Sequence, residues 1–70
     1  MKYTSKKNGY TGIVEEDYFP GIGKHWDYAV FNEKGKFIYH ATLESPMTEE
    51  ELAEDVDNFT ESLKTIRGFL

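Results

Sequence analysis

Residues 46–70 carry nearly every local signal that specifies an α-helix, and this segment constrains the fold more than any other. Thr48 suits the N-cap position because its hydroxyl can accept a hydrogen bond from a free amide of the first turn. Glu51, three residues later, completes a capping box. Met47 and Leu52 flank the cap as a hydrophobic staple. These signals predict that a helix begins at residue 48.

Apolar residues then recur at spacings of four and three, which places them on one face of a helix. These residues are Leu52, Val56, Phe59, Leu63 and Ile66. Gly68 suits the left-handed position that often follows a helix. The pattern therefore predicts a helix over residues 48–67 with one apolar face.

The net charge of −5 is confined to the same segment. Residues 1–45 hold six lysines and six carboxylates, whereas residues 46–70 hold seven carboxylates against Lys64 and Arg67. The acidic residues on the outer face of the predicted helix are Glu50, Glu54, Asp57 and Glu61. Such a row can mimic nucleic-acid phosphates in the basic groove of a partner, although an ordinary solvated helix face is commoner.

The rest of the chain has the pattern of antiparallel hairpins. Asn8-Gly9 favours a tight turn between strands near residues 2–7 and 10–16. Aromatic and β-branched residues over 26–32 and 36–44 flank a second turn. The segment between the hairpins, residues 17–25, contains proline and glycines and is expected to be an exposed loop.

The second turn, residues 32–35, sets Phe31 opposite Phe37 and Val30 opposite Ile38. In that register one face of the hairpin carries Ala29, Phe31, Phe37, Tyr39, Ala41 and Leu43. We expect the helix to pack on this face, because its alanines leave room. The other face would then be an aromatic candidate interaction face, formed by Trp26, Tyr28, Val30, Ile38 and His40. The alternative is that the first hairpin or residues 17–25 cover it.

The sequence thus predicts a single α+β domain over residues 1–70. Its antiparallel sheet has three or four strands in two hairpins, and the C-terminal helix packs on one face of the sheet. The expected order is ββββα, with βββα and a disordered N-terminus as the alternative.

Catalytic and metal chemistry have little support in the sequence. His25 and Asp27 lie on one side of a strand, as two metal ligands or a base with its orienting acid would. The expected register places His40 on the opposite face, and the chain has no cysteine. Residues 21–24, Gly-Ile-Gly-Lys, lack the spacing and the following helix of a phosphate-binding loop. No catalytic residue, metal or cofactor is predicted.

The leading hypothesis is therefore a non-enzymatic protein–protein interaction or regulatory module that uses the aromatic face or the acidic helix. Its partner would be another protein or a second copy of the chain. One alternative is single-stranded nucleic acid stacked on Trp26 and Tyr28, but three nearby lysines are few for that purpose. Another is an acidic nucleic-acid mimic. Without a signal peptide or a long apolar run, we expect a cytoplasmic protein with no membrane partner.

Overall fold

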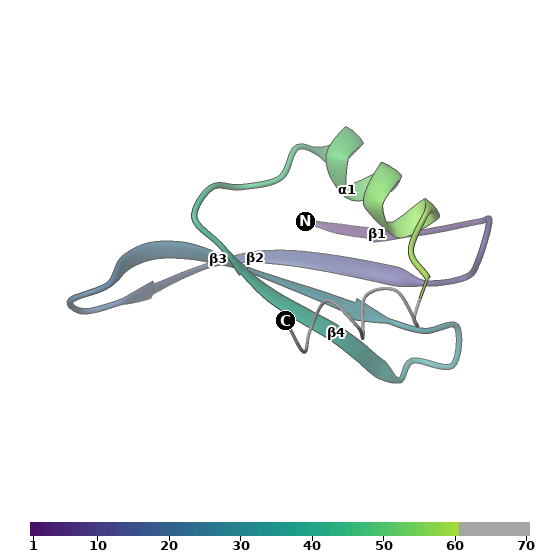
Figure 1. Cartoon of the computed structure of the whole chain (residues 1–70), viewed down its shortest axis with the longest axis horizontal. Helices are drawn as coiled ribbons and strands as arrows, with labels where there is room; N and C mark the ends of the chain where they lie inside the picture. The colour runs from purple at the N-terminus through teal and green to yellow at the C-terminus, as the bar shows by residue number, and fades with distance from the viewer. Residues whose placement is uncertain (61–70) are drawn as a thin grey trace.

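The computed structural model describes residues 1–60 of the chain and shows a four-stranded antiparallel sheet followed by one helix (Figure 1). The elements are β1 (Lys2–Thr4), β2 (Thr11–Phe19), β3 (Gly23–Phe31), β4 (Phe37–Leu43) and α1 (Glu49–Asp57). Each strand pairs with the next, in the order β1-β2-β3-β4. This arrangement confirms the predicted α+β class and the order ββββα.

Helix α1 begins where the capping signals predict. The Thr48 hydroxyl accepts a hydrogen bond from the Glu51 amide at 3.1 Å, and the Glu51 carboxylate accepts one from the Thr48 amide at 2.9 Å. The helix ends at Asp57, however, so the prediction of a helix over residues 48–67 is wrong at residues 58–60. Residues 61–67, with the apolar positions Leu63 and Ile66, lie outside the described part of the chain.

The early end of α1 has identifiable causes. Asn58 caps the last turn, because its side-chain amide and its backbone N–H both donate to the carbonyl of Glu54. The amide of Phe59 bonds to the Val56 carbonyl only three residues back, at 3.2 Å, which tightens the final turn. Asn8, in the loop after β1, donates to the same Val56 carbonyl at 2.8 Å.

Phe59 then turns onto the sheet and completes the core. Its ring centroid lies 5.8 Å from that of Tyr10 and 5.7 Å from that of Tyr39. The buried apolar side chains are Val14, Tyr28, Val30, Leu52, Val56 and Phe59. The core is therefore the layer between α1 and one face of the sheet.

Gly12 in β2 allows α1 to approach the sheet closely. A Cβ atom built on Gly12 would lie 2.5 Å from Cγ2 of Val56 and 3.0 Å from Cδ1 of Leu52. Neither distance leaves room for a side chain. The contact between β2 and α1 thus depends on a glycine at this position.

The β3–β4 hairpin has the predicted turn but not the predicted register. The amide of Asn32 bonds to the Lys36 carbonyl at 2.8 Å, and Phe31 lies opposite Phe37 as expected. The next pair is Val30 with Tyr39 rather than Val30 with Ile38, and the register shift lies between Val30 and Phe31. Ile38 is therefore the extra residue of a β-bulge.

Side chains alternate along a strand, so this shift of one residue changes which face of β3 lies on the same side of the sheet as Tyr39 of β4. Trp26, Tyr28 and Val30 share a face with Tyr39, Ala41 and Leu43, and all six belong to the core or pack against it. The prediction that α1 packs on the Ala29 and Phe31 side of β3 is therefore wrong. The expected positions of Tyr39, Ala41 and Leu43 on the helix side are confirmed.

Residues 17–25 form strand ends instead of the expected loop. β2 and β3 pair along their whole lengths, from Thr11 opposite Phe31 to Phe19 opposite Gly23. The turn between them takes only residues 20–22. Gly21 has φ +89, a conformation that other residues rarely adopt. A long β2–β3 hairpin thus extends beyond the region that α1 covers (Figure 1).

In the first hairpin β1 is shorter than the predicted 2–7, whereas β2 extends beyond the predicted 10–16 to Phe19. The loop between them begins at Ser5, whose hydroxyl oxygen accepts hydrogen bonds from the amides of Lys7 and Asn8. These bonds leave only Lys2–Thr4 for β1, with Lys2 opposite Ile13.

Within residues 1–60, no helix combines the length and the apolar composition that a membrane span requires.

Candidate functional site

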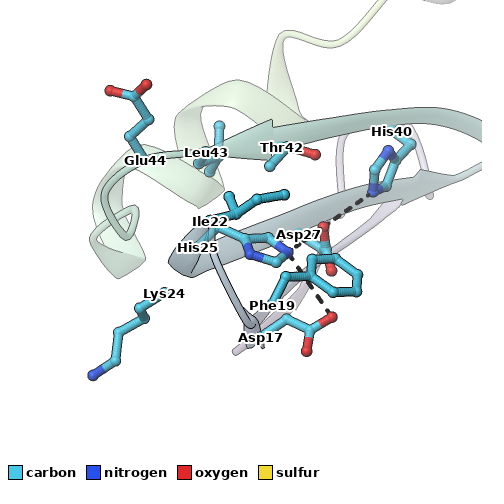
Figure 2. Close-up of a pocket in the computed structure, with 10 residues that line it drawn as sticks. All are labelled: Asp17, Phe19, Ile22, Lys24, His25, Asp27, His40, Thr42, Leu43 and Glu44. Carbon is cyan, nitrogen blue, oxygen red and sulfur yellow. Dashed lines mark ion pairs between the residues drawn. The ribbon is translucent and has the colours of Figure 1, made fainter.

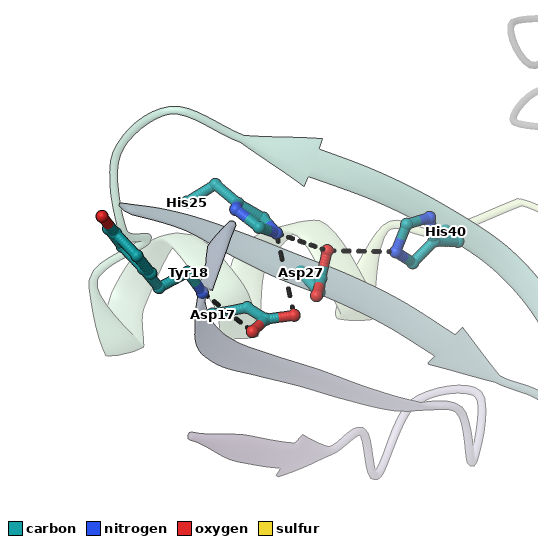
Figure 3. A network of polar contacts seen from close by, with 5 residues as sticks. All are labelled: Asp17, Tyr18, His25, Asp27 and His40. Carbon is teal, nitrogen blue, oxygen red and sulfur yellow. Dashed lines mark hydrogen bonds and ion pairs between the residues drawn. The ribbon is translucent and has the colours of Figure 1, made fainter. Parts of the chain in front are cut away.

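Two histidines and two aspartates meet on the outer face of the sheet, which is the face opposite α1. Asp17 of β2 lies opposite His25 of β3, and Asp27 follows His25 by two residues on the same face. His40 of β4 lies opposite Ala29, one position along from Asp27 on that face. We call Asp17, His25, Asp27 and His40 the His–Asp cluster (Figure 3).

Asp27 is the centre of the cluster. Its Oδ1 lies 3.4 Å from Nε2 of His40 and 3.7 Å from Nε2 of His25. Nε2 of His25 also lies 3.9 Å from Oδ2 of Asp17. The ligand-capable atoms of Asp17, His25 and Asp27 all lie within 4.8 Å of one another. Imidazole and carboxylate groups at these separations can bind a cation or exchange a proton.

His25 is fixed within the cluster by burial. Its side chain is only 8% exposed, and its ring stacks on Phe19 with centroids 5.1 Å apart and planes at 9°. Its Nδ1 is buried and has no hydrogen-bond partner among residues 1–60. Leaving a buried polar atom unpaired costs about 1–3 kcal/mol. The ring is thus held by packing, with Nε2 directed toward two carboxylates, as Figure 3 shows.

A pocket of about 780 Å³ contains the cluster (Figure 2). Apolar side chains of Phe19, Ile22 and Leu43 line it together with the four residues of the His–Asp cluster. Lys24, Thr42 and Glu44 complete the lining. A pocket with carboxylates, imidazoles and apolar groups suits a cation or a ligand that is both basic and apolar.

The turn of the β2–β3 hairpin exposes large apolar side chains. Tyr18 is 64% exposed, Phe19 is 52% exposed and Ile22 is 78% exposed. We call residues 18–22 the hairpin tip. Beside it, the exposed side chains of Glu16 and Lys24 form a salt bridge of 3.0 Å. Such an exposed pair adds little stability.

The aromatic face that the sequence suggests as an interaction surface is mostly core. Tyr28 and Val30 are buried beneath α1, whereas Trp26 and Ile38 are half-buried and pack against the same core. His40 lies on the other face of the sheet, in the His–Asp cluster. The prediction that these five residues share one face is therefore wrong, because the bulge at Ile38 exchanges the faces. The sequence leaves open whether that face is exposed or covered, and Tyr28 and Val30 are covered.

The Tyr28 hydroxyl is satisfied inside the protein. It donates a hydrogen bond to the carboxylate of Asp55 in α1. Burial raises the pKa of Tyr28 far above its ordinary value, and the hydrogen bond to Asp55 raises it further. This bond ties α1 to β3.

The predicted acidic helix face is divided between solvent and structure. Glu50 and Glu54 are exposed, as a surface for a basic partner would require. Asp57 instead accepts a hydrogen bond from the Tyr3 hydroxyl at 2.8 Å. Hydrogen bonds from the hydroxyls of Ser5 and Tyr3 lower the pKa of Asp57. Glu61 lies outside the described residues.

The sequence does not predict that Asp17 and His40 lie in one site with His25 and Asp27. The sequence predicts a loop at Asp17, and the register that it predicts places His40 on the opposite face from Asp27. The strand-favouring residues Tyr18 and Phe19, directly before the Pro20-Gly21 turn signal, indicate a longer β2. It would have brought Asp17 opposite His25. The bulge that brings in His40 has no comparable local signal.

Known proteins give no further guide to this site. Compared with protein-family models, with curated proteins and with solved structures, the chain has no match in any of the three. A small α+β fold does not by itself specify an activity, because one fold can support many functions. The hairpin tip and the His–Asp cluster are therefore the basis for assigning a function.

Proposed function

We propose that the protein is a non-enzymatic module that binds another protein through the hairpin tip. The observation that carries this proposal is the exposure of Tyr18, Phe19 and Ile22 within five consecutive residues. Apolar side chains that gather on an exposed surface usually mark an association site. Within residues 1–60, none of the three side chains belongs to the core under α1, and Phe19 packs instead on His25. A role in binding therefore accounts for the exposed Tyr18 and Ile22 better than a role in folding.

The charges around the tip indicate the chemistry of the partner. Glu15, Glu16 and Asp17 are exposed on β2 just before the tip. Lys24, the lysine of β3, is already paired with Glu16. The best complement is a protein surface with an apolar depression and basic residues around it.

Single-stranded nucleic acid fits this surface less well. Tyr28, one of the two aromatic residues expected to stack on bases, is buried beneath α1. The exposed carboxylates of Glu15, Glu16 and Asp17 would also repel phosphates. A protein partner is therefore the proposal, and a second copy of the chain is one form that the partner can take.

The proposal can be tested with a photo-crosslinking amino acid placed at Ile22 or, as a control, at Phe37. Both side chains are exposed and apolar, but Phe37 lies at the start of β4, away from the hairpin tip. We expect crosslinking in cells of the source organism to give one dominant product from position 22, either with a defined protein or with the chain itself.

Binding to the purified partner then decides the assignment. Ile22→Lys should weaken the complex at least tenfold, because it removes an apolar contact and brings a like charge to a basic partner. Phe37→Lys should leave the affinity unchanged. Absence of a dominant product at position 22, or equal weakening by both variants, would show that the hairpin tip is not the binding surface.

A further inference from the structure

We propose that the His–Asp cluster binds a divalent transition metal ion, with Asp17, His25 and Asp27 as ligands and His40 as the fourth. Imidazole nitrogens and carboxylate oxygens are ligands that Zn²⁺ and similar ions accept. Two groups of each kind meet in this cluster. The inference concerns a different ligand from the hairpin tip, and none of the four proposed metal ligands belongs to residues 18–22, although Phe19 of the tip packs on His25.

The spacing of the ligand atoms supports the assignment. In a tetrahedral zinc site with bonds of about 2.0–2.2 Å, neighbouring ligand atoms are roughly 3.3–3.6 Å apart. The three distances from the imidazoles to the carboxylates are 3.4, 3.7 and 3.9 Å. Both contacts of His25 are too long for a strong hydrogen bond. The ligand atoms of Asp17, His25 and Asp27 therefore face one another at separations that a shared ion can bridge after small movements. Within the cluster, His40 lies close to Asp27 alone and would reach the same ion by a larger movement of its half-exposed side chain.

The scaffold fixes three of these side chains through the sheet. Asp17, Asp27 and His40 come from β2, β3 and β4, so the backbone pairing sets how far apart they lie. His25 is held by its stacking on Phe19. Ligands on paired strands need little reordering when an ion binds, and this favours affinity.

The burial of His25 is a second, independent observation. Its side chain is more than nine-tenths buried, and its Nε2 points into the cluster, where both of its carboxylate contacts are longer than a hydrogen bond. A buried polar group that is poorly satisfied calls for an explanation, and an ion is one. Coordination through Nε2 would supply free energy that contacts at 3.7 and 3.9 Å do not.

The two imidazoles also determine which ions should bind. Mg²⁺ and Ca²⁺ take oxygen ligands almost exclusively, whereas Zn²⁺ accepts nitrogen and oxygen together. We therefore expect Zn²⁺ to bind much more tightly than either hard ion. A merely acidic surface would not make this distinction.

The test is a titration of the purified, chelator-treated full chain with ZnCl₂. Calorimetry and the NMR signals of the histidine rings monitor the binding. We expect one Zn²⁺ per chain and shifts of both His25 and His40 ring signals, with no comparable shifts in MgCl₂. Asp17→Asn should weaken Zn²⁺ binding by about tenfold or more. Glu16→Gln removes the same charge from the next residue, which lies on the other face of β2, and should leave the affinity unchanged.

His25 is buried, and its replacement can disturb folding. The decisive variants are therefore Asp17→Asn and His40→Gln, whose side chains are about half exposed. Each variant is accepted only with an amide spectrum that matches the wild type. Lack of saturable Zn²⁺ binding, equal weakening by Glu16→Gln, or equal affinity for Mg²⁺ would overturn the assignment.

Discussion

Nε2 of His40 lies 3.4 Å from Oδ1 of Asp27 on the neighbouring strand. The two residues are diagonal neighbours, because Asp27 lies opposite Thr42 and Ala29 lies opposite His40. Their contact depends on the extra residue Ile38, which shifts the rest of β4 by one position. Without this bulge, His40 would lie on the same side of the sheet as Tyr28. One irregularity in β4 thus decides which side chains enter the core and which form the His–Asp cluster.

Gly12→Ala should destabilise the protein by about 1–3 kcal/mol, because the new methyl group would overlap Val56. Urea unfolding of the variant measures this loss. Val56→Ala removes the clashing Cγ2 atom and provides a double-mutant cycle with Gly12→Ala. The loss in the double variant should be smaller than the sum of the two single losses. Strict additivity would mean that α1 does not approach β2 at this residue.

Asn8→Asp should lower the free energy of unfolding by about 1–3 kcal/mol, although the two side chains are nearly identical in shape. Asn8 donates through Nδ2 to the Val56 carbonyl, and a carboxylate cannot donate there. The new charge would also lie near the negative end of α1. Thermal or urea unfolding at neutral pH measures the effect.

Asn32→Asp is the matched control for Asn8→Asp. Asn32 uses only its carbonyl oxygen, which accepts hydrogen bonds from the amides of Lys34 and Lys36. A carboxylate preserves both bonds, so the change in the free energy of unfolding should stay within about 0.5 kcal/mol. Equal losses for the two substitutions would contradict the cap that Asn8 places on α1.

Thr48→Ala should lower the free energy of unfolding by about 1 kcal/mol, because the amide of Glu51 loses its capping partner. Thr48→Ser retains the hydroxyl and should lie close to the wild type. Urea unfolding of the three proteins makes the comparison. A serine variant as unstable as the alanine variant would argue against the cap as the cause.

The stability of the protein should fall as pH rises above about 10. The pKa values of Tyr28 and Tyr3 are raised in the folded state from an ordinary value of 10.0. A tyrosine whose pKa is higher in the folded state contributes its full stabilisation when the pH is below its pKa in the unfolded chain. This contribution is lost as the pH rises through its pKa in the folded state. For Tyr28, the loss is at most about 1.4 kcal/mol per pH unit.

Tyr28→Phe isolates this contribution. The variant should lose about 1–3 kcal/mol at pH 7, because Asp55 loses its hydrogen-bond donor. Its stability should also fall less steeply between pH 10 and pH 11 than that of the wild type. Urea unfolding over this range measures both effects. An unchanged slope would show that Tyr28 ionises as easily in the folded state as in the unfolded chain.

The sequence predicts the features that arise from neighbouring residues. The capping box at Thr48 and the turn at residues 32–35 form as expected, because their hydrogen bonds involve residues within a few positions. The α+β class follows from the same local patterns. The end of α1 is not predicted, because the local cap by Asn58 acts together with Asn8 and with the aromatic contacts of Phe59, which involve residues distant in the chain.

The site needed information that local patterns do not contain. His25 and Asp27 were identified as a pair from their spacing along one strand. Adding His40 requires the position of the bulge, and a shift of one residue moves a whole strand to the other face. Both registers place apolar residues on each side of the hairpin, so the alternation of side chains did not distinguish them.

The register of β3 and β4 is the most direct test, because both the core and the His–Asp cluster follow from it. Nuclear Overhauser effects between backbone protons identify which residues lie opposite each other. We expect contacts that pair Val30 with Tyr39 and Ala29 with His40, together with Phe31 paired with Phe37. Contacts that pair Val30 with Ile38 and Tyr28 with His40 would contradict the cluster, because His40 would then share a face with Tyr28.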